Sequence, residues 1–268
     1  MIKFPLNMVG GGFQHSTASS GYEIPKFIEW KKDLTADISI HIDEAIPLYG
    51  YERTKFAWIA ESSVIIPHVI DYVKANYNEL IEYYKLIFTH DKRLLSLGDR
   101  MKFVIPNAYP WIKDKKIHNK TKLASMIVSN KSGLVGYNYR LEWRDKMAKT
   151  GKVDIYGRGV NPVQIKEHGL NDYMFSFAME NSNYPSAFCE KITDCFATGT
   201  IPIFWGTPDI GDYFNIDGII MLNDNFDIDI LTPELYYSKM DAIKDNFERA
   251  INLPLAEDYM FSNYIKDL

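Results

Sequence analysis

The feature that most constrains the fold is a repeated order of short apolar run, polar loop and helical stretch. In the second half, apolar runs at 124–129, 153–156, 173–179 and 201–205 each end in glycine or polar residues. No hairpin turn signal separates one run from the next. Strands that return only after a helix must lie parallel, so the pattern predicts an α/β fold with a doubly wound parallel sheet.

The first half shows a looser version of the same order. We expect strands at 2–9, 38–42, 56–60, 86–89 and 103–105, a helix near 24–32, and a helix opened by Pro67 with apolar residues at spacings of three and four. The polar, basic stretch 109–122 is expected to connect two halves. Gly10-Gly11-Gly12, followed by His15, lacks both the G-x-G-x-x-G spacing and a lysine, so a turn is as good an interpretation as a phosphate loop.

Composition excludes several classes of function. The 268 residues have a formal net charge of −5, which argues against a nucleic acid partner, so any phosphate must be bound by a few local Arg and Lys side chains. Cys189 and Cys195 are too far apart along a helix for a disulfide, and no Cys/His cluster has zinc spacing. No apolar run approaches the ~20 residues of a membrane span, and the start lacks a signal peptide. We therefore expect a soluble, cytoplasmic protein without an integral membrane segment.

The segment 172–215 contains the candidate ligand-binding residues. Its strand ends with Glu180, Asn181 and Ser182. We expect the helix that follows to run from Pro185 to about Thr198, with Glu190 and Lys191 near its start. Ligands of open α/β sheets bind beyond the carboxyl ends of the strands, where helix N-termini also favour anions. A lysine there can neutralise a phosphate, and the adjacent carboxylate suits a pair of ribose hydroxyls.

These residues form a recognisable series. Met-Glu-Asn at 179–181, Cys-Glu-Lys at 189–191 and G-T-I-P-I-F-W-G-T-P at 199–208 stand in this order, preceded by V-D-I-Y-G-R-G at 153–159 and by Ser129-Asn130 with Arg140-x-x-Trp143. The series strongly resembles the donor-binding signature of family 10 glycosyltransferases, the α-1,3/4-fucosyltransferases. The resemblance covers about residues 124–215.

The resemblance implies a GT-B fold, with two Rossmann-like doubly wound domains facing a cleft. The N-terminal domain, 1–115, would handle a glycan acceptor, and the C-terminal domain, 116–268, the nucleotide sugar. It further implies an inverting transfer of L-fucose from GDP-fucose without a metal or other cofactor. The donor-binding residues implied are Arg140 and Lys191 for the diphosphate, Glu190 for ribose, and Asn181, together with Ser129, Asn130 and Gly157.

The implied general base is Glu61, because the strand ending in Ala60-Glu61-Ser62 resembles the family strand that ends in G-E-N. Ala60 and Ser62 depart from that tripeptide. Ala187 stands where the family has a tyrosine and Cys189 where it has a threonine, which leaves another nucleotide sugar open as the donor. A non-catalytic glycan- or nucleotide-binding module of the same fold also stays open. Asp227 and Asp229 form a D-x-D, which is common by chance, and we do not expect a metal there.

Overall fold

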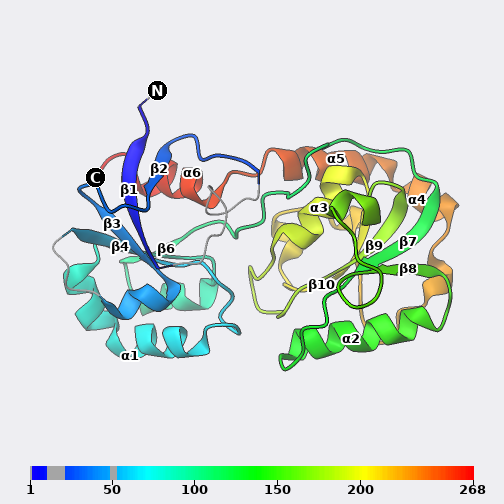
Figure 1. Ribbon diagram of the computed structural model, residues 1–268, viewed down its shortest axis with the longest axis horizontal. Helices are drawn as coiled ribbons and strands as arrows, with labels where there is room; N and C mark the ends of the chain where they lie inside the picture. The colour runs from blue at the N-terminus through cyan, green and yellow to red at the C-terminus, as the bar shows by residue number, and fades with distance from the viewer. Residues whose placement is uncertain (1, 11–21, 49–52) are drawn as a thin grey trace. The chain divides into compact units, whose positions relative to one another are not determined.

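The computed structural model describes residues 2–10, 22–48 and 53–268 of the chain. It divides into two compact units, each built around one parallel sheet (Figure 1). The first unit holds residues 1–107, 185–187 and 254–268, and the second holds 108–184 and 188–253. This division differs from the expected domains 1–115 and 116–268 chiefly at 254–268. There, Ala256 and Met260 are buried in the core of the first unit.

The sheet of the first unit has six strands in the order β2-β1-β3-β4-β5-β6. All neighbouring pairs are parallel. The strands are β1 (Phe4–Gly10), β2 (Ile28–Lys31), β3 (Ser39–Ile42), β4 (Thr54–Ile59), β5 (Leu86–Thr89) and β6 (Met101–Phe103), with helices α1 (Pro67–Tyr83) and α6 (Ala256–Met260).

Helices cover both faces of this sheet. Alternate residues of a strand point to opposite faces. Accordingly, Ala57 and Ile59 of β4 pack with Val73 of α1, whereas Phe56 and Trp58 pack with Met260 of α6. The unit is therefore doubly wound, as the sequence predicts.

The sheet of the second unit has five parallel strands in the order β11-β10-β9-β7-β8. Trp143 and Met147 of α2 pack on one face, and Ile192 and Phe196 of α3 lie in a separate core cluster. The elements are β7 (Lys122–Ile127), α2 (Val135–Ala148), β8 (Val153–Tyr156), β9 (Tyr173–Met179), α3 (Glu190–Thr198), β10 (Ile201–Trp205), β11 (Ile220–Met221), α4 (Pro233–Ser238) and α5 (Met240–Ile251).

Both sheets have the same internal order, since each begins with its second strand, then its first, then its third. The direction of winding changes between β1 and β3 in the first unit and between β7 and β9 in the second. In open parallel sheets, ligands bind outside the carboxyl ends of the strands at such a switch point. We therefore expect ligand-binding or catalytic residues among those that follow β3 and β9.

Two predicted elements were wrong. The expected helix near 24–32 is absent, and β2 lies there instead, with Ile28 paired to Phe4 of β1. Helix α3 begins at Glu190 rather than at Pro185, because Ser186 adopts a φ of 63°, which a right-handed helix does not allow. Gly11, Gly12 and His15 lie outside the described residues, so the glycine loop stays a prediction.

Candidate active site

The carboxyl end of β9 is where the predicted donor residues meet. Glu180 and Asn181 follow this strand directly, and the first turn of α2 lies against them. A Cβ added to Gly136 of α2 would stand 2.5 Å from both the carbonyl carbon and the oxygen of Asn181. The absence of a side chain at Gly136 thus lets α2 approach the Glu180–Asn181 backbone.

Glu180 is the buried acid of the site, with 3% of its surface exposed. Its Oε1 accepts a hydrogen bond from the backbone N–H of Cys189 at 2.9 Å, just before α3 begins. Its Oε2 accepts one from the Lys191 ammonium at 3.0 Å. One carboxylate therefore fixes both the start of α3 and the lysine in its first turn. Glu180 belongs to the Met-Glu-Asn motif at 179–181, but no role for it was predicted from the sequence.

Lys191 and Cys189 are in direct contact. The Lys191 Nζ donates to the Cys189 Sγ at 2.7 Å, and the thiol donates to Glu180 Oε2 at 3.1 Å. Burial favours the neutral amine, but Cys189, Glu180 and Glu190 outweigh it and raise the pKa of Lys191 well above its usual range. Burial and the same two carboxylates raise the pKa of the Cys189 thiol. The site thus places the Lys191 ammonium against both the Cys189 sulfur and the Glu180 carboxylate.

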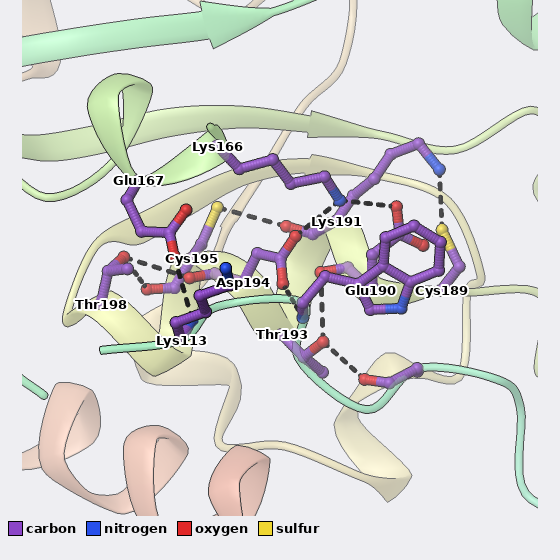
Figure 2. Close-up of polar contacts among 12 residues, drawn as sticks. Lys113, Lys166, Glu167, Cys189, Glu190, Lys191, Thr193, Asp194, Cys195 and Thr198 are labelled. Atoms are coloured by element: carbon purple, nitrogen blue, oxygen red, sulfur yellow. Dashed lines mark hydrogen bonds and ion pairs between the residues drawn. The ribbon is translucent and has the colours of Figure 1, made fainter. Parts of the chain in front are cut away.

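Glu190 is held by a lysine that the sequence gave no reason to select. Lys166, the first residue of the short helical turn Lys166–Gly169 that precedes β9, donates from Nζ to Glu190 Oε1 at 2.9 Å and to Asp194 Oδ2 at 2.8 Å. Figure 2 shows the Lys166 side chain reaching toward these two carboxylates of α3. The Lys166 ammonium also lies 5.0 Å from the ring centroid of Trp111.

Two lysines and two acids at the start of α3 influence one another's ionisation. Burial opposes ionisation of Glu190, but Lys166 and Lys191 hold its pKa well below the usual range. Asp194 is almost fully buried, and burial raises its pKa to about 6 although Lys166 and the N–H of Trp111 favour its anion. The spacing of Glu190 and Asp194, one helical turn apart, was a visible signal that both lie on one face of α3.

Arg140 of α2 is buried, with 7% of its surface exposed. Its Nη2 donates to the carbonyl oxygen of Met179 at 2.6 Å, and its guanidinium carbon lies 5.4 Å from the Tyr137 ring centroid. It therefore lies beside Glu180 and Asn181, and its role toward a donor stays a prediction. In this structure it binds main chain at the end of β9.

The other predicted donor residues follow β7 and β8. Ser129 is half-buried, and the exposed Asn130 accepts a hydrogen bond from Arg144 Nη1 at 3.2 Å. Gly157 has a φ of 137°, and a Cβ there would stand 1.7 Å from the carbonyl oxygen of Val128. Close approach of two strand ends thus explains glycine at 157 on structural grounds.

The predicted base, Glu61, belongs to the first unit, at the end of β4. Its side chain is exposed, and its Oε1 accepts a hydrogen bond from the backbone N–H of Ser62 at 2.7 Å. Asp43, which follows the neighbouring strand β3, accepts hydrogen bonds from the backbone N–H groups of Ala60 and Glu61. Asp43 was not among the residues predicted from the sequence.

No described helix is both long and apolar enough to cross a membrane. No group of three or more His, Cys, Asp or Glu residues within the described ranges has the arrangement of a metal site, and Asp227 caps the short turn at Asp229 instead.

Comparison with known proteins agrees with the motif series. Residues 117–242 match the model of the family described as glycosyltransferase family 10 (fucosyltransferase), C-terminal part. The chain is also 26% identical over 161 residues to the α-(1,3)-fucosyltransferase FucT of Helicobacter pylori. That match includes 59% of this chain and 34% of the relative, so the chain spans about a third of the relative's length. The resemblance to family 10 through the second unit is confirmed.

Solved structures extend the likeness to the fold of both units. An α1,3-fucosyltransferase crystal structure has a TM-score of 0.60 and 16% identity, over 98% of this chain and 90% of that one. An α1,3-fucosyltransferase structure with GDP-fucose has a TM-score of 0.52 and 16% identity, over 94% of this chain and 82% of the other. The predicted GT-B type, with two parallel-sheet α/β units, is confirmed.

Proposed function

We propose that this protein is an inverting glycosyltransferase that moves L-fucose from GDP-fucose to a hydroxyl of a glycan acceptor. The observation that most supports this is the group formed by Glu180, Cys189, Glu190 and Lys191 at the switch point of the second sheet. It falls within the segment matched by the family 10 model, and α1,3-fucosyltransferases of the same fold have been solved with GDP-fucose and with GDP.

The donor would be held through its diphosphate and its ribose. Lys191 supplies an ammonium at the N-terminal turn of α3, where the helix dipole adds to its attraction for phosphate. Arg140 contributes a second cation close by, and Asn181 orients the phosphates or the sugar. Glu190, with its Oε1 fixed by Lys166, would accept hydrogen bonds from the ribose hydroxyls.

The reaction would be a direct displacement at the anomeric carbon of fucose. The acceptor oxygen forms a bond to that carbon, the bond from the carbon to the diphosphate oxygen breaks, and GDP leaves with the electron pair. A carboxylate at the edge of the first sheet, predicted from the sequence as Glu61, takes the acceptor proton. Lys191 and Arg140 stabilise the charge that develops on the diphosphate, so the proposal requires no metal.

A cytoplasmic setting is part of the proposal. Cys189 and Cys195 are both free thiols, and unpaired cysteines are typical of proteins in reducing compartments.

A different nucleotide sugar is the second candidate for the donor. The family's tyrosine three residues before the Glu-Lys pair is Ala187 here. Alanine lacks both the ring and the hydroxyl, so it cannot make the contacts of a tyrosine, and this departure keeps another nucleotide sugar open as the donor.

Titration calorimetry tests the proposal directly. GDP, GDP-fucose, GDP-mannose, UDP and UDP-glucose are titrated into the wild type, Lys191→Ala, and Lys149→Ala as a control at an exposed lysine of the same unit. We expect selective binding of GDP and GDP-fucose, weakened at least ~10-fold in Lys191→Ala, the scale of a lost charged hydrogen bond. Tight binding of another nucleotide sugar would show that the donor sugar is not fucose. Absence of binding by every nucleotide refutes the proposed transferase.

A further inference from the structure

Two acids of α3 share one lysine. Lys166 Nζ donates to Glu190 Oε1 and to Asp194 Oδ2, so its ammonium bridges both carboxylates (Figure 2). The Glu190 side chain is 18% exposed, whereas that of Asp194 is 2% exposed. One acid of the pair is therefore open to a ligand, and the other can act on a ligand only through Lys166.

Asp194 is fixed on its other side by main chain. Its Oδ1 accepts the backbone N–H of Trp111 at 2.6 Å. The Trp111 ring lies against the same lysine, since the Lys166 Nζ is 5.0 Å from the ring centroid. Lys166 is thus held by two carboxylates and an aromatic ring, and one of those carboxylates is itself anchored. An ammonium with these partners has little freedom to move away from Glu190.

The segment 108–113, which supplies this N–H, is attached at two further points. Thr193 Oγ1 of α3 donates to the carbonyl oxygen of Ala108 at 2.5 Å. The backbone N–H of Lys113 donates to Glu167 Oε1 at 3.0 Å, in the turn that begins with the shared lysine. The segment is therefore bound both to α3 and to that turn, which fixes the N–H that reaches the buried acid.

The charge of Asp194 can change at mild acidity. Burial raises its pKa to about 6, and the charge of Glu190 adds to burial, while Lys166 and the Trp111 N–H oppose it. A cavity of about 50 Å³ beside Asp194 has room for water with which the carboxyl group can exchange a proton. The titratable groups beside Asp194 are Glu190, Lys166, Lys191 and Cys195. The side chains of β7 and β9 that line the cavity are uncharged: Ile127, Ser176 and Phe177.

We propose that Asp194 is a positioning residue of the donor site: its carboxylate holds Lys166, and Lys166 holds Glu190 in the direction that accepts the ribose hydroxyls. This inference rests on the proposed function. When Asp194 is protonated, its Oδ2 no longer attracts the ammonium, and Lys166 pairs with Glu190 alone. Glu190 is then more completely neutralised and less available to ribose. Donor affinity should therefore fall as the pH falls through about 6.

This coupling between Asp194 and the donor has to work in both directions. If the ionised acid strengthens donor binding, a bound donor lowers the pKa of Asp194 by the same free energy. One charged hydrogen bond is worth about tenfold in affinity, which equals about one pKa unit. Donor binding at pH 5.5 should therefore release about half a proton to the solvent.

Titration calorimetry with GDP-fucose measures both effects. This probe is used because the terminal phosphate of GDP itself titrates near pH 6, whereas the phosphates of the sugar diphosphate do not. The variants are Asp194→Asn, Lys166→Met and Asp217→Asn, the last at an exposed acid of the same unit. Asparagine keeps an oxygen for the Trp111 N–H but carries no charge. Each protein is titrated between pH 5 and 8 in two buffers of different ionisation enthalpy, and thermal unfolding shows which variants are folded.

We expect the wild-type Kd for GDP-fucose to rise about fivefold from pH 7.5 to pH 5, toward a limit of about tenfold, with proton release at pH 5.5. Asp194→Asn should bind about tenfold more weakly than wild type at pH 7.5, with no change over this range and without that proton. It should also lose the preference for GDP over 2′-deoxy-GDP, a loss that a merely structural role does not predict. Asp217→Asn should behave as wild type.

Other outcomes overturn the inference. If folded Asp194→Asn binds as tightly as wild type at pH 7.5 and keeps the preference for GDP, Asp194 serves only the fold. If Asp194→Asn does not fold, Lys166→Met decides: a flat pH profile supports the role of Asp194, and a profile like that of wild type refutes it. These results leave the proposed transferase in place. A wild type that binds no GDP-fucose at pH 7.5 removes the transferase, and the role of Asp194 falls with it.

Discussion

Lys191 donates a hydrogen bond to the buried carboxylate of Glu180 at 3.0 Å, so the cation assigned to a phosphate already has an anionic partner within the protein. The Lys191 side chain is 33% exposed and that of Glu180 is 4% exposed. The buried Glu180 carboxylate therefore contributes to the stability of the fold. The Lys191 ammonium is partly exposed, so an anionic ligand can still reach it.

Glu180→Gln tests how much the Glu180–Lys191 ion pair stabilises the fold. Removal of one partner of a buried pair costs about 3–5 kcal/mol, and because Lys191 is partly solvated we expect a loss of about 1–3 kcal/mol in the free energy of unfolding. Urea denaturation measures it, with Glu142→Gln on the exposed side of α2 as the control. Equal stability of Glu180→Gln and wild type would show that the pair does not stabilise the fold.

Lys166→Met tests how Glu190 is positioned. Without the ammonium that holds its Oε1, Glu190 should lose its fixed direction toward ribose, and GDP should bind about tenfold more weakly, the scale of one charged hydrogen bond. The specific signature uses 2′-deoxy-GDP in calorimetry. Wild type should prefer GDP over the deoxy form, and Lys166→Met should not. A preference kept in the variant, with Lys149→Met as the control, would place ribose recognition elsewhere.

Gly136→Ala tests the contact between α2 and the end of β9. The added methyl group would stand 2.5 Å from the backbone of Asn181, and we expect an overpacking cost of about 1–3 kcal/mol with weaker GDP binding. Gly211→Ala is the matched control, since a Cβ there meets nothing within 4 Å. Thermal and urea unfolding of both variants measure the difference. If Gly136→Ala is as stable as Gly211→Ala, the helix can move away at no cost.

Lys120 gives a prediction for pH. It is buried, and its ammonium donates to the carbonyl oxygens of Asn171 and Thr198 and to the hydroxyl of Thr200. Burial nevertheless lowers the pKa of Lys120 to about 7.

Above that pH the folded protein gives up a proton that the unfolded chain keeps, so stability should rise with pH between about 7 and 10.4, by at most ~1.4 kcal/mol per unit. Urea unfolding of wild type and Lys120→Met at pH 6.5, 7.5 and 8.5 compares the slopes. Only wild type should show the rise. Parallel slopes would mean that Lys120 stays charged in the fold.

The sequence by itself determined the parallel α/β fold and most of the second unit. The strands at 153–156, 173–179 and 201–205 were found at the residues where they lie, because buried parallel strands are short apolar runs with polar ends. The same local pattern placed Asn181, Glu190 and Lys191 at a strand end and a helix start, where β9 and α3 have them.

Tertiary structure alone decided the contacts between distant segments. β2 is a strand because its backbone pairs with β1, a long-range interaction that overrides local preference near 24–32. Lys166 reaches Glu190 and Asp194 across 24 and 28 residues, and Asp43 accepts from the N–H of Glu61 18 residues away. Such pairs depend on which strand ends become neighbours in the folded sheet. No periodicity in the sequence indicates which strand ends become neighbours, because the adjacency of parallel strands is set by the order of winding and not by spacing along the chain.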